Sequence, residues 1–94
     1  MHKYYNKAID EGNSNAMTNL GYYYRYTEWN NYLMKKYYLD AIELGNSIAM
    51  NNLGVYYQMI EKNYDLMKKY YLDAIALGSL FAMVNLCYYY VKKI

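Results

Sequence analysis

Ala49-Met50-Asn51-Asn52-Leu53-Gly54-Val55-Tyr56-Tyr57 is one of three related stretches that decide the fold of this 94-residue chain. Ala16-Met17-Thr18-Asn19-Leu20-Gly21-Tyr22-Tyr23-Tyr24 precedes it by 33 residues, and Ala82-Met83-Val84-Asn85-Leu86-Cys87-Tyr88-Tyr89-Tyr90 follows it by 33. Three further triplets keep the same spacing: Tyr4, Tyr37 and Tyr70; Ala8, Ala41 and Ala74; Gly12, Gly45 and Gly78. A fixed period between about 20 and 50 residues indicates a solenoid, in which each unit packs chiefly on its neighbours.

Each unit contains two amphipathic helical patterns. Ala49, Leu53, Tyr57 and Ile60 form one apolar stripe at helical spacing, and a second stripe is made by Met67, Tyr70, Tyr71, Ala74 and Ile75. We name the first the inner helix and the second the outer helix. These patterns predict six helices joined by short turns, near residues 2–11, 14–27, 30–44, 47–60, 63–77 and 79–93. The predicted divisions are a half unit at 1–12, repeats at 13–45 and 46–78, and a half unit at 79–94.

The glycines and caps fit this division. Gly45 and Gly78 follow outer helices, where a left-handed residue is favoured, and Asn63 is placed to cap an outer helix. Gly21 and Gly54 lie inside inner helices, where glycine costs about 1 kcal/mol relative to alanine. This repeated cost predicts close helix crossings.

Two expectations follow from those crossings. Ala41 and Ala74 are expected to supply the small residues that face the helical glycines. Cys87 takes the glycine's place in the third copy, and we expect it to be buried and inert.

Composition narrows the function classes. The chain has 17 tyrosines against one Phe and one Trp, so most rings should be buried with their hydroxyls at the surface. A net charge of +2 is too small to indicate a nucleic-acid or membrane partner. One cysteine excludes an internal disulfide, and no apolar run approaches about 18 residues. We expect a soluble intracellular, cytoplasmic protein.

Catalytic groups are scarce. His2 is the only histidine, and Asp40 and Glu43 lie on an outer face with no second acidic cluster to raise a pKa. Neither a Cys/His metal-binding spacing nor a glycine loop that cradles phosphate is present. Lys36 and Lys69 each precede an aspartate by four residues, which favours solvated ion pairs over a phosphate site. The sequence therefore predicts a non-enzymatic protein that binds no metal and no cofactor.

The pattern Ala-x-x-x-Leu-Gly-x-x-Tyr, then a short turn and Tyr-Tyr-x-x-Ala-x-x-x-Gly, resembles the Sel-one-like repeat of the tetratricopeptide superfamily. It is most similar to the Tyr- and Asn-rich versions of giant DNA viruses, and the resemblance covers nearly all of the chain. It implies a right-handed α-solenoid of antiparallel helix pairs that acts as a scaffold or adaptor. The turn Glu61-Lys62-Asn63 departs from the family because it lacks the family's Gly-x-Gly.

In tetratricopeptide relatives the inner helices line a concave groove, where an Asn before the Leu-Gly pair can hold a peptide backbone. Asn19, Asn52 and Asn85 match that position. Their groove neighbours would be Asn15, Thr18, Tyr22, Arg25 and Tyr26, then Ile48, Asn51, Val55, Gln58 and Met59, then Phe81, Val84 and Tyr88. The alternative interpretation is that each unit was copied together with a solvated Asn.

Both predicted end helices look uncapped, whereas solenoids normally cover their terminal repeats with polar helices. The apolar residues are Tyr4, Tyr5, Ala8 and Ile9 in the first helix, and Phe81, Val84, Leu86, Tyr89 and Val91 in the last. Met1 is in register with Met34 and Met67, so a second copy placed after Ile94 would resume the pattern after a gap of five residues. This register predicts head-to-tail self-association into a helical filament.

The sequence thus predicts a non-enzymatic interaction module that binds copies of itself. Two alternatives remain open at this point. One is a monomeric adaptor that holds a peptide or a partner helix in the groove, and the other is a piece of a longer array.

Overall fold

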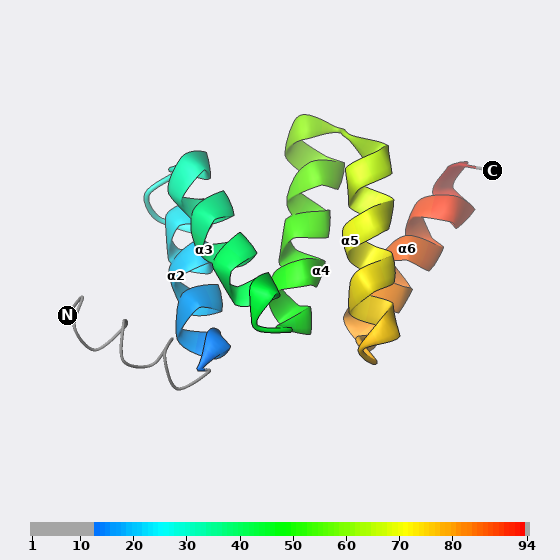
Figure 1. Cartoon of the computed structure of the whole chain (residues 1–94). Helices are drawn as coiled ribbons and strands as arrows, with labels where there is room; N and C mark the ends of the chain where they lie inside the picture. The colour runs from blue at the N-terminus through cyan, green and yellow to red at the C-terminus, as the bar shows by residue number, and fades with distance from the viewer. Residues whose placement is uncertain (1–12, 94) are drawn as a thin grey trace.

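The computed structural model describes residues 13–93, which form five α-helices in sequence order (Figure 1). They are α2 (Ser14–Tyr26), α3 (Asn31–Glu43), α4 (Ser47–Tyr56), α5 (Tyr64–Ala76) and α6 (Leu80–Lys93). A π-helical turn, η1 (Tyr57–Glu61), continues α4. No strand occurs in this part of the chain, so the all-α prediction is confirmed and the last five helices fall where they were predicted. The helix predicted near 2–11 lies outside the described residues.

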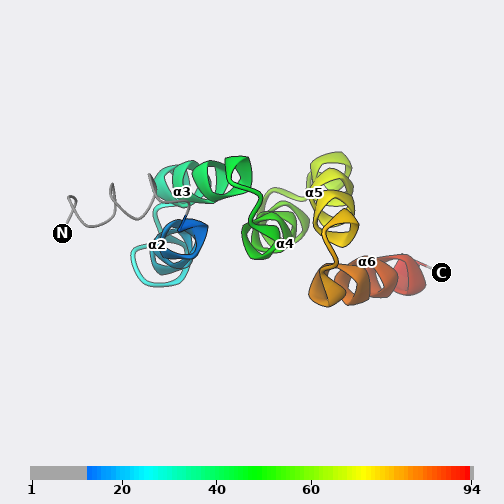
Figure 2. The same ribbon diagram turned by 60° about the horizontal axis from the view of Figure 1, so that its bottom comes forward.

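The helices form two layers that follow the division into inner and outer helices. α2, α4 and α6 lie on one side in Figure 2, and α3 and α5 on the other. Each helix packs on the next in sequence, and α4 also contacts both α2 and α6. The principal extents are 48 × 27 × 17 Å. Within residues 13–93, no helix combines the length and the apolar character needed to cross a bilayer.

Side-chain caps start four of the five helices. The backbone N–H groups of Leu33, Ala49, Leu66 and Ala82 donate to Asn30, Asn46, Asn63 and Ser79 at 3.1, 2.9, 3.2 and 3.1 Å. Gly45 and Gly78 end the outer helices with φ of 82° and 90°, as the sequence predicted. Each of the two described turns from an outer to an inner helix therefore has a glycine stop followed at once by a capping side chain, Asn46 in one and Ser79 in the other.

The turns from inner to outer helix were not predicted in detail. Trp29 and Lys62, 33 residues apart, both adopt a left-handed conformation with φ of 55°. The next residue donates its N–H across the turn, Asn30 to the Tyr24 carbonyl at 2.8 Å and Asn63 to the Tyr57 carbonyl at 2.9 Å. Neither Trp nor Lys is a residue that favours this conformation, so it could not be predicted from the residue types at positions 29 and 62.

The helical glycines lie against tyrosine rings. A Cβ built on Gly21 would come within 2.6 Å of the Tyr38 ring, and one on Gly54 within 2.6 Å of the Tyr71 ring. The predicted close crossings therefore exist, but the glycines face aromatic rings where we expected Ala41 and Ala74. Both rings are almost completely buried, so each glycine provides space for a large core side chain.

A second pair of aromatic contacts repeats beside these crossings. Tyr24 stacks on Tyr37 at 5.7 Å, and Tyr57 stacks on Tyr70 at 5.8 Å, each pair with an interplanar angle of 7°. α2 thus meets α3, and α4 with η1 meets α5, through the same glycine and tyrosine positions. The outer surface carries the two predicted pairs, Lys36–Asp40 at 3.4 Å and Lys69–Asp73 at 3.1 Å.

Candidate interaction surfaces

One stripe of α6 is exposed although its counterparts in α4 and η1 are buried. Met83 is 46% exposed and Tyr90 is 48% exposed, whereas Met50 and Tyr57, 33 residues earlier, are each 8% exposed. Cys87 completes the stripe and is also exposed. The difference arises because α5 covers this side of α4, while no helix of the described residues covers it on α6. We call Met83, Cys87 and Tyr90 the open stripe of α6.

The exposure of Cys87 corrects the expectation that this thiol is buried. The glycine at its position is buried in α2 and α4 because a tyrosine from the next helix lies over it. No such ring lies over position 87 within residues 13–93, which leaves its side chain in solvent.

The predicted terminal contact residues of α6 differ in their exposure. Leu86 and Tyr89 are only 8% and 7% exposed, because they belong to the core shared with α4 and α5, where the Tyr89 ring lies 5.4 Å from that of Tyr64. Phe81, Val84 and Val91 are exposed as expected. The predicted partner residues Tyr4, Tyr5, Ala8 and Ile9 lie outside the described residues.

The asparagines of the predicted peptide clamp are not equivalent. Asn19 is exposed, while Asn52 and Asn85 are partly buried. Asn85 Nδ2 donates to Asn51 Oδ1 at 2.9 Å, a bond that connects α6 with α4. One predicted groove residue therefore uses another as its partner, so the three amides do not form a uniform row of free hydrogen-bonding groups.

The other predicted groove residues divide into packed and exposed side chains. Arg25 is buried, with its guanidinium 4.7 Å from the ring centroid of Tyr26 and 5.9 Å from that of Tyr56. Gln58, the counterpart of Arg25, accepts a hydrogen bond from the Tyr71 hydroxyl at 2.8 Å. Val55 is partly buried, and Tyr22 and Tyr88 are exposed.

An ionic contact links the two repeats and was missed in the sequence. The Lys35 ammonium group pairs with the Glu61 carboxylate, which also accepts a hydrogen bond from the Tyr56 hydroxyl at 2.7 Å. Hydrogen bonds from Lys35 and then Tyr56 lower the pKa of Glu61, and the Glu61 contact raises the pKa of Lys35. The partners are 26 residues apart, a separation that neither helical spacing nor the 33-residue period indicates.

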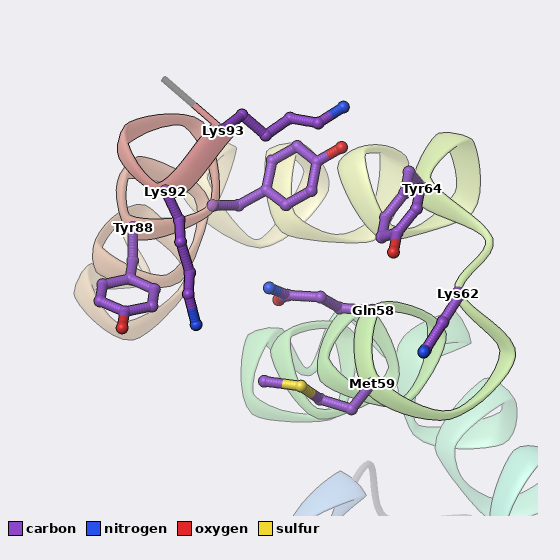
Figure 3. A pocket seen from close by; sticks show the side chains of 8 residues that line it. Gln58, Met59, Lys62, Tyr64, Tyr88, Lys92 and Lys93 are labelled. Atoms are coloured by element: carbon purple, nitrogen blue, oxygen red, sulfur yellow. The ribbon is translucent and has the colours of Figure 1, made fainter.

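A pocket of about 350 Å³ opens between η1, the start of α5 and the end of α6 (Figure 3). Its lining residues are Gln58, Met59, Lys62, Tyr64, Tyr88, Tyr89, Lys92 and Lys93. The Lys93 ammonium group lies 5.2 Å from the ring centroid of Tyr89, and its interaction with the Tyr89 hydroxyl raises the pKa of Lys93. Only Gln58, Met59 and Tyr88 were predicted to line a groove, because the lysines come from segments that the sequence gives no reason to bring together.

Residues 13–93 hold no group of three His, Cys, Asp or Glu side chains placed to bind a metal ion. The chain matches no protein-family model, no curated protein and no solved structure. Its resemblance to Sel-one-like repeats therefore rests on the sequence pattern alone.

Proposed function

We propose that the chain is a non-enzymatic interaction module, a right-handed α-solenoid of the Sel-one-like type that docks a further helix on the open stripe of α6. One observation carries the proposal. The same methionine and tyrosine positions are covered by an outer helix on α4 but are exposed on α6. Apolar surface of this kind favours association once it is removed from water.

The proposed occupant is residues 1–12 of a second copy. Both outer helices of the structure place the pattern Met-x-x-Tyr-Tyr-x-x-Ala against an inner helix, through Met34, Tyr37, Tyr38 and Ala41 in α3 and Met67, Tyr70, Tyr71 and Ala74 in α5. Met1, Tyr4, Tyr5 and Ala8 carry the same pattern in the same register. A contact between the end of one copy and the start of the next is heterologous, so it builds a filament unless the rotation closes a ring.

Sedimentation velocity over a concentration series tests the proposal. The wild-type chain is expected to grow in size with concentration, and Met83→Asp is expected to remain monomeric because it places a charge on the open stripe. Met59→Asp is the matched control, since Met59 is also an exposed methionine but lies outside the stripe. A wild-type chain that stays monomeric up to about 100 μM, well above a micromolar Kd, would contradict self-association.

A second candidate is a monomeric adaptor that binds an extended peptide along the inner helices. It is favoured by the exposure of Tyr22, Ile48 and Tyr88 on α2, α4 and α6. This candidate predicts a size that does not change with concentration, so the same sedimentation series separates the two functions.

A further inference from the structure

The residues that line the pocket between η1, α5 and α6 mostly differ from their counterparts 33 positions earlier. Of its eight lining residues, only Tyr89 has an identical counterpart 33 positions earlier, Tyr56. Three lysines replace apolar residues found 33 positions earlier: Lys62 stands where the first repeat has Trp29, and Lys92 and Lys93 stand where the second repeat has Met59 and Ile60. Packing between repeats does not require these three lysines, because the residues 33 positions earlier, Trp29, Met59 and Ile60, are apolar.

The pocket also exists because a long side chain has been shortened. In the first unit Arg25 fills this region and is buried beside the rings of Tyr26 and Tyr56. Gln58 replaces Arg25, and its Oε1 is turned toward the Tyr71 hydroxyl at 2.8 Å. Its amide NH2 group then remains as a donor toward the pocket (Figure 3).

The electrostatics of the pocket select for anions. No Asp or Glu among residues 13–93 lines it. The ion pairs among residues 13–93 use Lys35, Lys36 and Lys69, so no carboxylate of this part of the chain neutralises Lys62, Lys92 or Lys93. Three positive charges and an amide donor around a space of about 350 Å³ match the size and polarity of a small-ligand site.

We propose that this pocket binds an organic phosphate, and specifically a mononucleotide. Lysine ammonium groups are compact charges suited to phosphate oxygens. The exposed ring of Tyr88 offers a flat apolar surface for a base, and the Lys92 ammonium group lies 5.5 Å from its centroid. The Tyr64 ring packs against Tyr89 at 5.4 Å, so Tyr88 is the stacking residue. The pocket therefore supplies contacts to both parts of a nucleotide. This assignment is independent of the self-association proposed above.

The test uses the whole chain and isothermal titration calorimetry with AMP, adenosine and inorganic phosphate as probes. AMP is expected to bind at one site per chain, and each of the other two probes to bind at least about tenfold more weakly, because each lacks half of the contacts. Raising the salt concentration is expected to weaken AMP binding, since the lysines are solvent-exposed.

Variants that restore the residues found 33 positions earlier keep the test independent of folding. Lys92→Met and Lys93→Ile place in α6 the residues that η1 already accommodates as Met59 and Ile60, and together they are expected to weaken AMP binding by about tenfold or more. Lys69→Gln is the matched control, because Lys69 is an exposed lysine paired with Asp73 outside the pocket.

Three results would overturn the assignment. The first is that AMP shows no saturable binding. The second is that adenosine binds as tightly as AMP, and the third is that Lys69→Gln weakens AMP binding as much as the pocket variants do.

Discussion

Gly54 lies directly under the ring of Tyr71, so close that a Cβ at position 54 would stand 2.6 Å from the ring carbon Cδ1. The ring has no exposed surface, so it has no free space into which it can move. The same relationship holds between Gly21 and Tyr38. It explains why the helix keeps a residue that disfavours helix formation.

Gly54→Ala is therefore expected to lower the free energy of unfolding by about 1–2 kcal/mol, because overpacking a filled crossing outweighs the gain of about 1 kcal/mol in helix propensity. Urea denaturation measures the change. Cys87→Ala is the control, because the exposed position 87 has no ring over it and should tolerate the change. A more stable Gly54→Ala variant would mean that the tyrosine ring moves aside easily.

Position 87 should also control self-association. If a tyrosine of a second copy docks over α6 as Tyr71 does over α4, the Cβ of Cys87 obstructs the ring. Cys87→Gly is expected to tighten association about tenfold, the equivalent of about 1.4 kcal/mol, while Cys87→Leu weakens it. Sedimentation of the two variants measures the difference. Equal association by both would show that no ring docks there.

The left-handed conformation of Lys62 predicts a stabilising substitution. Its φ of 55° costs about 1–2 kcal/mol for a residue with a Cβ, and glycine adopts it freely. Lys62→Gly is expected to raise the free energy of unfolding by about 0.5–1 kcal/mol after the greater entropy of the unfolded chain is subtracted. Lys36→Gly, inside α3, should instead lower it by about 1 kcal/mol. Urea denaturation tests the prediction, which requires the free energy of unfolding to rise in Lys62→Gly and to fall in Lys36→Gly.

Burial raises the pKa of Tyr71 from 10.0 to about 12. Because the folded state keeps this proton at a pH where the unfolded chain releases it, the neutral hydroxyl contributes its full stabilisation below about pH 10, and this is lost as pH rises toward about 12. Tyr71→Phe should flatten the decline of stability over this range. Urea denaturation between these pH values tests it, with the exposed Tyr88 changed to Phe as the control. If the free energy of unfolding of Tyr71→Phe falls with pH as steeply as that of the wild-type chain, the raised pKa of Tyr71 does not cause the decline.

The sequence predicted the helices well because repetition multiplies weak local signals. Gly45 and Gly78 marked the helix ends, and Asn63 and its counterparts marked the starts. What the sequence did not predict depends on contacts between units. Leu86 looked like an exposed terminal residue, although it is buried against the preceding helices. The alanines looked like the partners of the glycines, because their size suggested a close crossing and nothing in the period indicated a ring.

The two candidate surfaces also differ in how far the 33-residue period predicts them. Met83 and Tyr90 could have been found by comparing each residue with the one 33 positions earlier and asking which outer helix covers it. The pocket required the opposite approach, because Lys62, Lys92 and Lys93 become notable only where they differ from their counterparts. The residues that recur every 33 positions thus predict the core that the repeats share. The candidate binding sites lie where a residue differs from its counterpart 33 positions earlier.

The two joints between successive inner helices are built differently. Asn46 caps α4 and also reaches back, with its Nδ2 donating to Ser14 Oγ at 2.8 Å and to Asn15 Oδ1 at 2.9 Å at the start of α2. Its counterpart, Ser79, is shorter and bonds only to the backbone N–H of its own helix. The second joint has one side-chain hydrogen bond between inner helices, from Asn85 Nδ2 in α6 to Asn51 Oδ1 in α4 at 2.9 Å. With two such bonds against one, the first joint resists bending more strongly than the second. Under load it should flex near α6, which would let the docking end change its angle while the remainder stays rigid.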